Sequence, residues 1–437
     1  MEWYQAGLFL LGSILILMAI GFPVALAFLI TNLIGALVFI GGLSGLTQVI
    51  DNSSTMITRF SLAPVPLFIL MGSLFFHTGL ALRVFDGLDQ LFGRLPGRLC
   101  YLTVAGGSIF STLTGSSMAN TAMLGSLMVP EMQRRGYSTR MSVGPILGTG
   151  GLAMIIPPST LAVLLATIAN IDVGRLLIAG LLPGVVLAVL YAALIYFQLL
   201  IWPDSAPAYD VEPSPWSQRI KMLVVQVMPM GLIIFLVVGL IILGITTPSE
   251  AAAFGVLGVV LLGAAYRCLT RQAIIKSLTE TVKVTGMVLF ILMNSAVFSQ
   301  LLAFSGASSG LLNWATGFEV SPHVVILVML ILLILLGMFM DPVSMMLITI
   351  PIFFPLVSFL NFDLFWFSVL MLMALEMSLT TPPFGILLFV MMGVAPKGMT
   401  LFQVAGAAMP FLICDAILIA LLMLFPALAL YLPGLMG

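Results

Sequence analysis

Long uncharged stretches dominate the chain and predict its membrane-crossing elements. Most of them exceed the roughly 20 apolar residues that a helix needs to cross a bilayer. The first is 48 residues long, so we expect it to hold two spans, separated at Gly21-Phe22-Pro23. The pattern predicts an all-α polytopic membrane protein with about ten transmembrane helices and two re-entrant hairpins. The uncharged stretches are 3–50, 60–82, 99–130, 141–171, 176–203, 222–249 and 284–318.

The two halves of the chain carry the same landmarks in the same order. The pairs Pro157-Pro158 and Pro382-Pro383 are 225 residues apart. The heptapeptide LFILMGS at 67–73 returns as LFILMNS at 289–295, with six of seven residues identical. We interpret this pattern as an internal duplication. The predicted units are a first repeat at 1–202, a Pro-rich acidic linker on the cytoplasmic side at 203–221 and a second repeat at 222–437.

Small and polar residues interrupt one of the uncharged stretches within a few positions. The sequence STLTGSSMANT at 111–121 does not suit a simple span, and basic residues stand at both ends of its segment. We therefore predict a re-entrant hairpin, which is tolerated at membrane depth only against protein or a wet cavity. Each repeat has one hairpin, followed by a span that a double proline breaks. The hairpins are predicted at about 99–133 and 322–360, with tips at 114–120 and 337–342, and the broken spans at about 141–170 and 364–395.

The distribution of Lys and Arg predicts that the repeats are inverted. Basic residues flank the first hairpin at both ends, whereas the second hairpin has no Lys or Arg nearby. By the positive-inside rule the base of the first faces the cytoplasm and the base of the second faces away. This topology puts 13 of the 15 basic residues inside, all but Arg59 and Arg175, and both termini outside the cytoplasm. The residues that flank the first hairpin are Arg83, Arg94, Arg98, Arg134, Arg135 and Arg140.

The hairpin tips and the helix breaks place oxygen ligands deep in an apolar chain. Proline lacks an N–H and frees carbonyls of the preceding turn, which, with Ser, Thr and Asn oxygens, can bind a small hard cation such as sodium. Helix N-termini beside them favour an anionic group. Paired discontinuous helices in inverted repeats are typical of a secondary transporter, although close packing alone could explain any one motif. The predicted substrate-binding residues are Ser116, Ser117, Pro157, Pro158, Pro382 and Pro383.

Three carboxylates fall within the predicted apolar segments. A carboxylate near the middle of a bilayer is costly and usually functional. Asp341, at the second tip, could coordinate a cation, cap the second hairpin helix or form an ion pair, and we favour capping or support of an ion site. Glu376 and Asp415 have no counterpart in the other repeat, so we favour structural pairing for both.

Composition excludes several classes of function. The chain is 61% hydrophobic and 7% charged, against about a quarter charged in a soluble domain. A net charge of −1 gives no reason to expect a nucleic-acid partner. The three cysteines are far apart, and His77 and His323 each stand alone, so the sequence predicts no metal or redox site. It contains no Gly-rich phosphate loop, so ATP bound to this chain is not expected to supply energy.

Four stretches together resemble the large membrane subunit of tripartite ATP-independent periplasmic (TRAP) transporters. The resemblance implies an inverted-repeat, elevator-type ion-transporter fold in the bacterial inner membrane, with both hairpins in a mobile domain. It also implies coupling to sodium, a separate small four-helix membrane subunit, and a periplasmic binding protein that delivers acids such as sialic acids and C4-dicarboxylates. The stretches are GSSMANTA, GTGGLAMIIPPS, MDPVSMMLITIPIFFP and SLTTPPFGILLFV.

The resemblance further implies two sodium sites and no cofactor other than the coupling ions. Met118 is bulkier than the residue expected at its place in the first tip. The first site would use Ser116, Ser117, Asn120, Gly150 and Gly151, and the second Gly337, Met340, Asp341, Thr380 and Thr381.

Three other functions remain open beside the TRAP permease. A stand-alone sodium/organic-anion symporter would share the fold. An ion channel would need a continuous polar path, whereas the polar residues cluster at the two tips. An intramembrane enzyme would need a base near Ser116 or Ser117, and no His or Lys lies in the neighbouring motifs, so no enzymatic activity is predicted. The sequence does not distinguish one organic acid from another.

Overall fold

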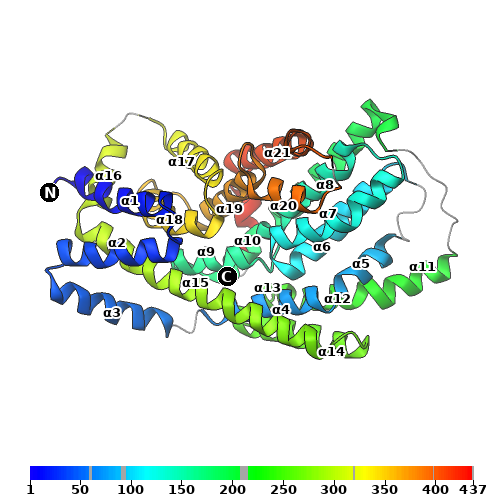
Figure 1. The fold of residues 1–437 in the computed structure, drawn as a ribbon, viewed down its shortest axis with the longest axis horizontal. Coiled ribbons are helices and arrows are strands. Elements are labelled where there is room, and N and C mark those ends of the chain that lie inside the picture. The colour runs from blue at the N-terminus through cyan, green and yellow to red at the C-terminus, as the bar shows by residue number, and fades with distance from the viewer. Residues whose placement is uncertain (59–61, 90–94, 207–214, 318–319, 397, 436–437) are drawn as a thin grey trace.

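All regular elements in the described part of the chain are helices (Figure 1), which confirms the predicted all-α class. The computed structural model describes residues 1–58, 62–89, 95–206, 215–317, 320–396 and 398–435. Arg59, Arg94 and most of the proposed linker lie outside these residues. The division into inverted repeats therefore stays a prediction.

The first half begins with helices that flank the later site. Pro23 stands immediately before the second helix, where its missing N–H costs nothing, and Gly21 before it has a φ of +99°. These residues separate two helices within the first uncharged stretch, as expected. The helices are α1 (Trp3–Ala19), α2 (Val24–Phe39), α3 (Leu43–Ile57), α4 (Pro64–His77) and α5 (Leu80–Asp89).

The segment of the first predicted hairpin consists of two helices that pack against each other. They are α6 (Arg98–Thr114) and α7 (Ser117–Arg134), separated only by Gly115 and Ser116. The span with the double proline is two helices, α8 (Thr139–Ile155) and α9 (Thr160–Ala169), bent by 41° at the break. The long helix α10 (Val173–Ile201) completes this half.

The second half repeats this order of elements after its own set of flanking helices. Its hairpin helices α17 and α18 also pack against each other, and a helix broken at the second double proline follows them. The segment Ile220–Ile242 is one helical span of 23 residues that includes two π-helical turns. The remaining helices are α14 (Pro248–Ala265), α15 (Arg271–Phe304), α16 (Ala307–Thr316), α17 (Pro322–Gly337), α18 (Pro342–Phe359), α19 (Leu364–Thr380), α20 (Ile386–Val394), α21 (Leu401–Leu424) and α22 (Ala427–Gly434).

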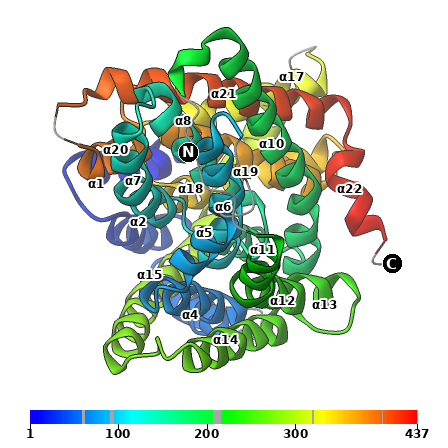
Figure 2. The same cartoon turned by 90° about the vertical axis from the view of Figure 1, so that its right-hand side faces the viewer.

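The molecule has two layers in both views (Figures 1 and 2). Helices α4, α14 and α15 lie on one side, and α17 and α21 lie on the opposite side, with α6, α18 and α19 between them. The 34-residue helix α15 runs along the side that holds α4 and α14, and it contacts α2, α3 and α4. We call α2, α3, α4, α14 and α15 the scaffold layer. The hairpins and broken helices, α6 to α9 and α17 to α20, form the hairpin layer.

The two broken helices form the centre of the hairpin layer. Every residue of α8 from Met141 to Ile155 is buried, and so is nearly all of α19. Glycine makes the close approach of α8 to α21 possible, because a Cβ added at Gly148 would lie 2.4 Å from a ring carbon of Phe411. Pro157 and Pro158 of the first break are buried in protein, whereas Pro383 of the second break is exposed.

Six described helices are long and apolar enough to cross a bilayer, or seven if α8 and α9 count as one broken span. A further five apolar helices have 10 to 17 residues, among them α17 and α19 of the second half. The chain is therefore a multi-pass membrane protein. The expected number of about ten spans depends on which of the shorter helices cross the bilayer, so that number stays a prediction.

Candidate functional site

Both hairpin tips border a single cavity of about 470 Å³ between the hairpin layer and the scaffold layer. The first tip contributes Ser116, Ser117 and Met118, and the second contributes Asp341 and Val343. The start of α9 and the end of α19 also reach it. On the scaffold side the cavity is lined by Ile69, Gly72, Ser73 and Phe76 of α4 and by Glu280, Val284, Met287 and Val288 of α15.

The first tip turns because of the residues between its two helices. Gly115 has a φ of +59°, in the left-handed region that glycine adopts without strain. Ser116 then caps α7, since its hydroxyl accepts a hydrogen bond from the Ala119 N–H at 3.3 Å. A Cβ at Gly115 would lie 2.7 Å from the Thr160 hydroxyl, so the tip rests directly on the start of α9.

The residues predicted for the first sodium site lie together below this tip. The Ser117 hydroxyl donates to Oε2 of Glu376 at 3.2 Å, and the Asn120 amide donates to the Thr149 carbonyl at 2.9 Å. Gly150 and Gly151 lie against the same group of residues. A Cβ at Gly150 would be 2.7 Å from the Thr121 hydroxyl, which is buried and has no hydrogen-bond partner among the described residues.

Glu376 is the residue of this site that sequence reasoning missed. Its side chain is 1% exposed, and within the described part of the chain no Lys, Arg or His pairs with it. Its Oε1 atom has no hydrogen-bond partner there either. Its partner Ser117 is a tip residue, so the structure brings Glu376 to the residues predicted for the first sodium site. A buried carboxylate of this kind carries a large desolvation cost unless a cation or a proton neutralises it.

A signal for Glu376 was present in the repeat. Glu376 and Gly151 each stand six residues before the first proline of their own helix break. In the structure these two equivalent positions face each other, because a Cβ at Gly151 would lie 2.8 Å from Cγ of Glu376. The absence of a side chain at Gly151 in α8 leaves space for the Glu376 side chain of α19.

The second tip begins with a capped helix. Asp341 accepts hydrogen bonds from the N–H groups of Val343 and Ser344, each at 3.1 Å, and from the Ser344 hydroxyl. The expected capping role is confirmed, and the carboxylate offsets the positive end of α18. Gly337 lies against α19, since a Cβ there would be 2.0 Å from the Ser378 hydroxyl. Met340 is buried beside it.

Thr380 and Thr381 end α19 at the second break. Their hydroxyls donate to the Met377 carbonyl at 3.2 and 2.5 Å. The rings of Phe339 and Phe384 lie 5.4 Å apart and join the second tip to this break. The hydroxyl oxygens of Thr380 and Thr381 keep lone pairs that the hydrogen bonds they donate do not use.

The four prolines mark the breaks but do not line the cavity. Pro157-Pro158 separates α8 from α9, and Pro382-Pro383 separates α19 from α20; both Pro-Pro peptide bonds are cis. Met154, Thr160 and Leu379 beside them reach the cavity wall, whereas no proline of either pair does. Ser116 and Ser117 are the predicted substrate residues that the structure brings to the cavity.

Asp415 lies outside the cavity and has its own partner. The Tyr191 hydroxyl donates to its Oδ1 at 2.5 Å, and both residues are buried between α10 and α21. Structural pairing is confirmed for Asp415.

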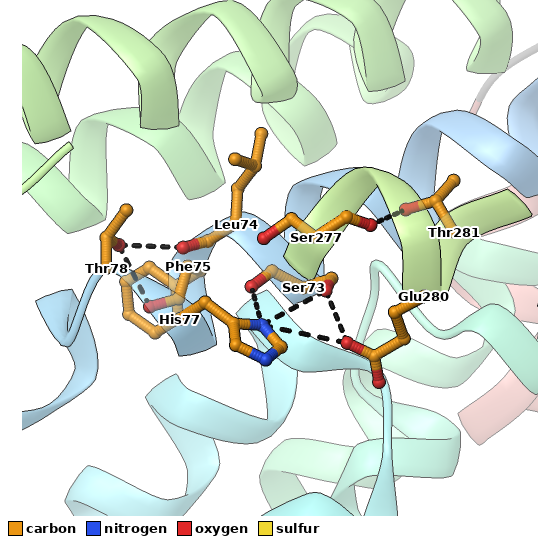
Figure 3. Close-up of polar contacts among 8 residues, drawn as sticks. All are labelled: Ser73, Leu74, Phe75, His77, Thr78, Ser277, Glu280 and Thr281. Carbon is orange, nitrogen blue, oxygen red and sulfur yellow. Dashed lines mark hydrogen bonds and ion pairs between the residues drawn. The ribbon is translucent and has the colours of Figure 1, made fainter. Parts of the chain in front are cut away.

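A second polar cluster on the scaffold wall was not predicted, because His77 has no chemical neighbour in sequence. The Ser73 hydroxyl donates to Oε2 of Glu280 at 2.5 Å, and the same oxygen lies 3.6 Å from Nδ1 of His77 (Figure 3). Ser73 and His77 both approach the same oxygen of Glu280. His77 therefore does not lie between the Ser73 hydroxyl and the Glu280 carboxylate, as the histidine of a hydrolase triad lies between its serine and its acid. Among the described residues, no three His, Cys, Asp or Glu side chains are placed to hold a metal ion.

Paired hairpins, broken helices and a cavity between two layers define a membrane permease. The family model of the tripartite ATP-independent periplasmic transporter DctM component matches residues 11–428. The chain belongs to this family of TRAP large permeases, a family of transporters and not of enzymes.

Named relatives agree with this assignment. The chain is 31% identical to the C4-dicarboxylate TRAP transporter large permease DctM of Pseudomonas aeruginosa, covering 87% of each chain. It is 28% identical to the ectoine TRAP transporter large permease TeaC of Halomonas elongata, covering 95% of this chain and 96% of that one. It is 29% identical to the sialic acid TRAP transporter large permease SiaM of Vibrio cholerae, covering 97% of each.

A solved structure shares the fold at low sequence identity. The Alcanivorax borkumensis YdaH transporter aligns with a TM-score of 0.63 over 89% of this chain and 90% of its own, at 14% identity. This agreement and the helical architecture confirm the expected all-α polytopic fold.

Proposed function

We propose that this chain is the large permease of a sodium-coupled TRAP transporter that takes up small carboxylic acids by an elevator mechanism. The observation that carries the proposal is the single cavity bordered by both hairpin tips. An elevator needs one substrate site that moves with its hairpins past a fixed scaffold. A cavity with hairpin residues on one wall and α4 and α15 on the other has this geometry.

Two helix N-termini support binding of a carboxylate in this cavity. Helices α7 and α9 begin at its wall, through Ser117 and Thr160. The first turn of a helix has unpaired N–H groups and a partial positive charge, which stabilise an anion. The substrates in the names of the three relatives share a carboxylate group, which agrees with this chemistry.

Sodium coupling is supported by the buried oxygens below the first tip. We propose that sodium binds near Ser117, Asn120 and Glu376, with the Gly150-Gly151 pair allowing the close approach. The unpartnered Oε1 of Glu376 and the unpartnered Thr121 hydroxyl are oxygen ligands of the kind that a hard cation selects. Bound sodium would neutralise the carboxylate and fix the tip that caps the cavity. A second sodium is proposed at Gly337, Met340, Asp341, Thr380 and Thr381.

We propose that the transporter is complete only with a separate small membrane subunit and a periplasmic binding protein, in the inner membrane. Both termini would lie on the periplasmic side, following the distribution of Lys and Arg. Family membership supports the partners, and a stand-alone sodium symporter is the alternative.

Uptake into vesicles tests the function. The permease would be reconstituted with the small subunit and with the binding protein encoded beside it, and loaded with the radiolabelled solute that this receptor binds. We expect uptake only with an inward sodium gradient and with all three proteins present. Equal uptake with potassium in place of sodium would contradict the coupling, and equal uptake by the permease alone would support the stand-alone symporter instead.

A further inference from the structure

Glu280 stands on the scaffold wall of the cavity with its carboxylate held in place. Its side chain is 52% exposed, and it lines the cavity from α15. On α4, the Ser73 hydroxyl donates to Oε2 at 2.5 Å and Nδ1 of His77 lies 3.6 Å from it. In Figure 3 the other carboxylate oxygen points away from both partners. That atom, Oε1, has no hydrogen-bond partner in the part of the chain that the structure describes.

The direction of this side chain is not set by its own helix. Lys276 and Lys283 lie four residues before and three residues after Glu280, at the spacings where helical ion pairs form. Neither forms an ion pair with it, although all three side chains belong to described residues. The carboxylate turns instead to α4 and to the cavity, so the hydrogen bond from Ser73 holds a negative charge at the cavity wall.

The cavity has opposite electrostatic character on its two walls. No Lys or Arg is found among the described residues that line it. On the hairpin wall, the starts of α7 and α9 supply partial positive charge, and the start of α18 and the Asp341 carboxylate that caps it offset each other. On the scaffold wall, Glu280 is a full negative charge without a Lys or Arg partner. A dipolar solute fits this arrangement better than a dianion, which would place a second carboxylate near Glu280.

We propose that Glu280 binds a cationic nitrogen of the substrate, and that the substrate is a zwitterion with one carboxylate and one ammonium or amidinium group. The inference rests on the proposed transport function and narrows its substrate class. The carboxylate faces the hairpin tips, and the cationic group faces Glu280. Ser73 and His77 position the carboxylate and do not touch the substrate.

Uptake of four solutes of different charge tests the inference. The probes are glycine betaine and ectoine, which are zwitterions, succinate, which is a dianion, and N-acetylneuraminate, which is a monoanion. Each is offered with the binding protein encoded beside the permease. We expect sodium-driven uptake of a zwitterion. The change Glu280→Gln is expected to lower that uptake about tenfold or more at low solute concentration, because it removes a charged hydrogen-bond acceptor.

Two further variants separate the role of the charge from a defect in folding. Glu131→Gln makes the same chemical change in the exposed pair with Arg135, outside the cavity, and is expected to leave uptake unchanged. Glu280→Asp keeps the charge and is expected to retain the preference for zwitterions. Gel filtration with the small subunit reports assembly of every variant.

Three results would overturn the inference in distinguishable ways. Uptake of succinate or N-acetylneuraminate but of neither zwitterion would contradict the substrate class. Wild-type kinetics in an assembled Glu280→Gln transporter would contradict the role of Glu280. Absence of sodium-driven uptake of all four solutes by the wild-type transporter would contradict the proposed function itself.

Discussion

Replacing Glu376 by glutamine is expected to abolish sodium-driven uptake at ordinary sodium concentrations. Glutamine keeps the size of the side chain and can still accept the hydrogen bond from Ser117, so the packing of α19 against α8 should persist. What is lost is the negative charge. Breaking a buried charge pair costs about 3–5 kcal/mol, so the affinity for sodium should fall on the order of 100-fold or more.

The measurement is the sodium dependence of initial uptake rates in vesicles, together with sodium binding to the purified membrane complex. Glu131→Gln is the control, because it makes the same chemical change in an exposed carboxylate that pairs with Arg135. We expect this control to retain its sodium dependence. A Glu376→Gln transporter with unchanged sodium affinity would show that the carboxylate is not an ion ligand.

The double change Ser117→Ala with Asn120→Ala is expected to weaken sodium binding at least about tenfold. It removes the hydroxyl that donates to Glu376 and the amide that donates to the Thr149 carbonyl. Each buried partner left without its hydrogen bond costs about 1–3 kcal/mol. The first tip would lose its attachment to both α8 and α19, so uptake should fall together with sodium binding.

Docking of the periplasmic receptor should survive this change, because the altered groups lie inside the hairpin layer. Ser126→Ala in the same helix removes an exposed hydroxyl that bonds only to the Met123 carbonyl, and serves as the control. Full sodium-driven uptake by the double variant would mean that the first tip is a packing turn and not an ion site.

The hairpins and broken helices could be predicted because their residues conflict with an ordinary membrane span. The run from Thr114 to Asn120 places small polar residues in an apolar stretch, and a double proline cannot continue a helix. Each conflict involves residues that are neighbours in sequence, so it can be recognised from the sequence alone. The helix bounds at Thr114, Ser117, Ile155 and Thr160 match the positions that the conflicts indicate.

Glu376 and Glu280 could not be assigned in the same way because their partners are distant in sequence. Ser117 is 259 residues from Glu376, and Ser73 is 207 residues from Glu280. The packing of both α7 and α19 on α8, and of α4 on α15, brings these pairs together. For the prolines the sequence suggested substrate contact. Thr160 and Leu379 beside the breaks line the cavity and the four prolines do not, so contact of the prolines with substrate stays a prediction.

Access to Met118 from the two sides of the membrane tests the elevator account most directly. Met118 lies at the first tip, lines the cavity and is 43% exposed. The variant Met118→Cys would be made in a chain with Cys268→Ser, since Cys100 and Cys414 are buried. It would be treated with a membrane-impermeant thiol reagent from either side of oriented vesicles.

We expect the introduced cysteine to be labelled from each side in separate experiments. Addition of sodium and substrate should change the ratio of the two labelling rates. This outcome requires the tip to become accessible alternately to the periplasm and to the cytoplasm. Labelling from one side only, whatever the sodium and substrate concentrations, would contradict the claim that the cavity between the two tips is carried across the membrane.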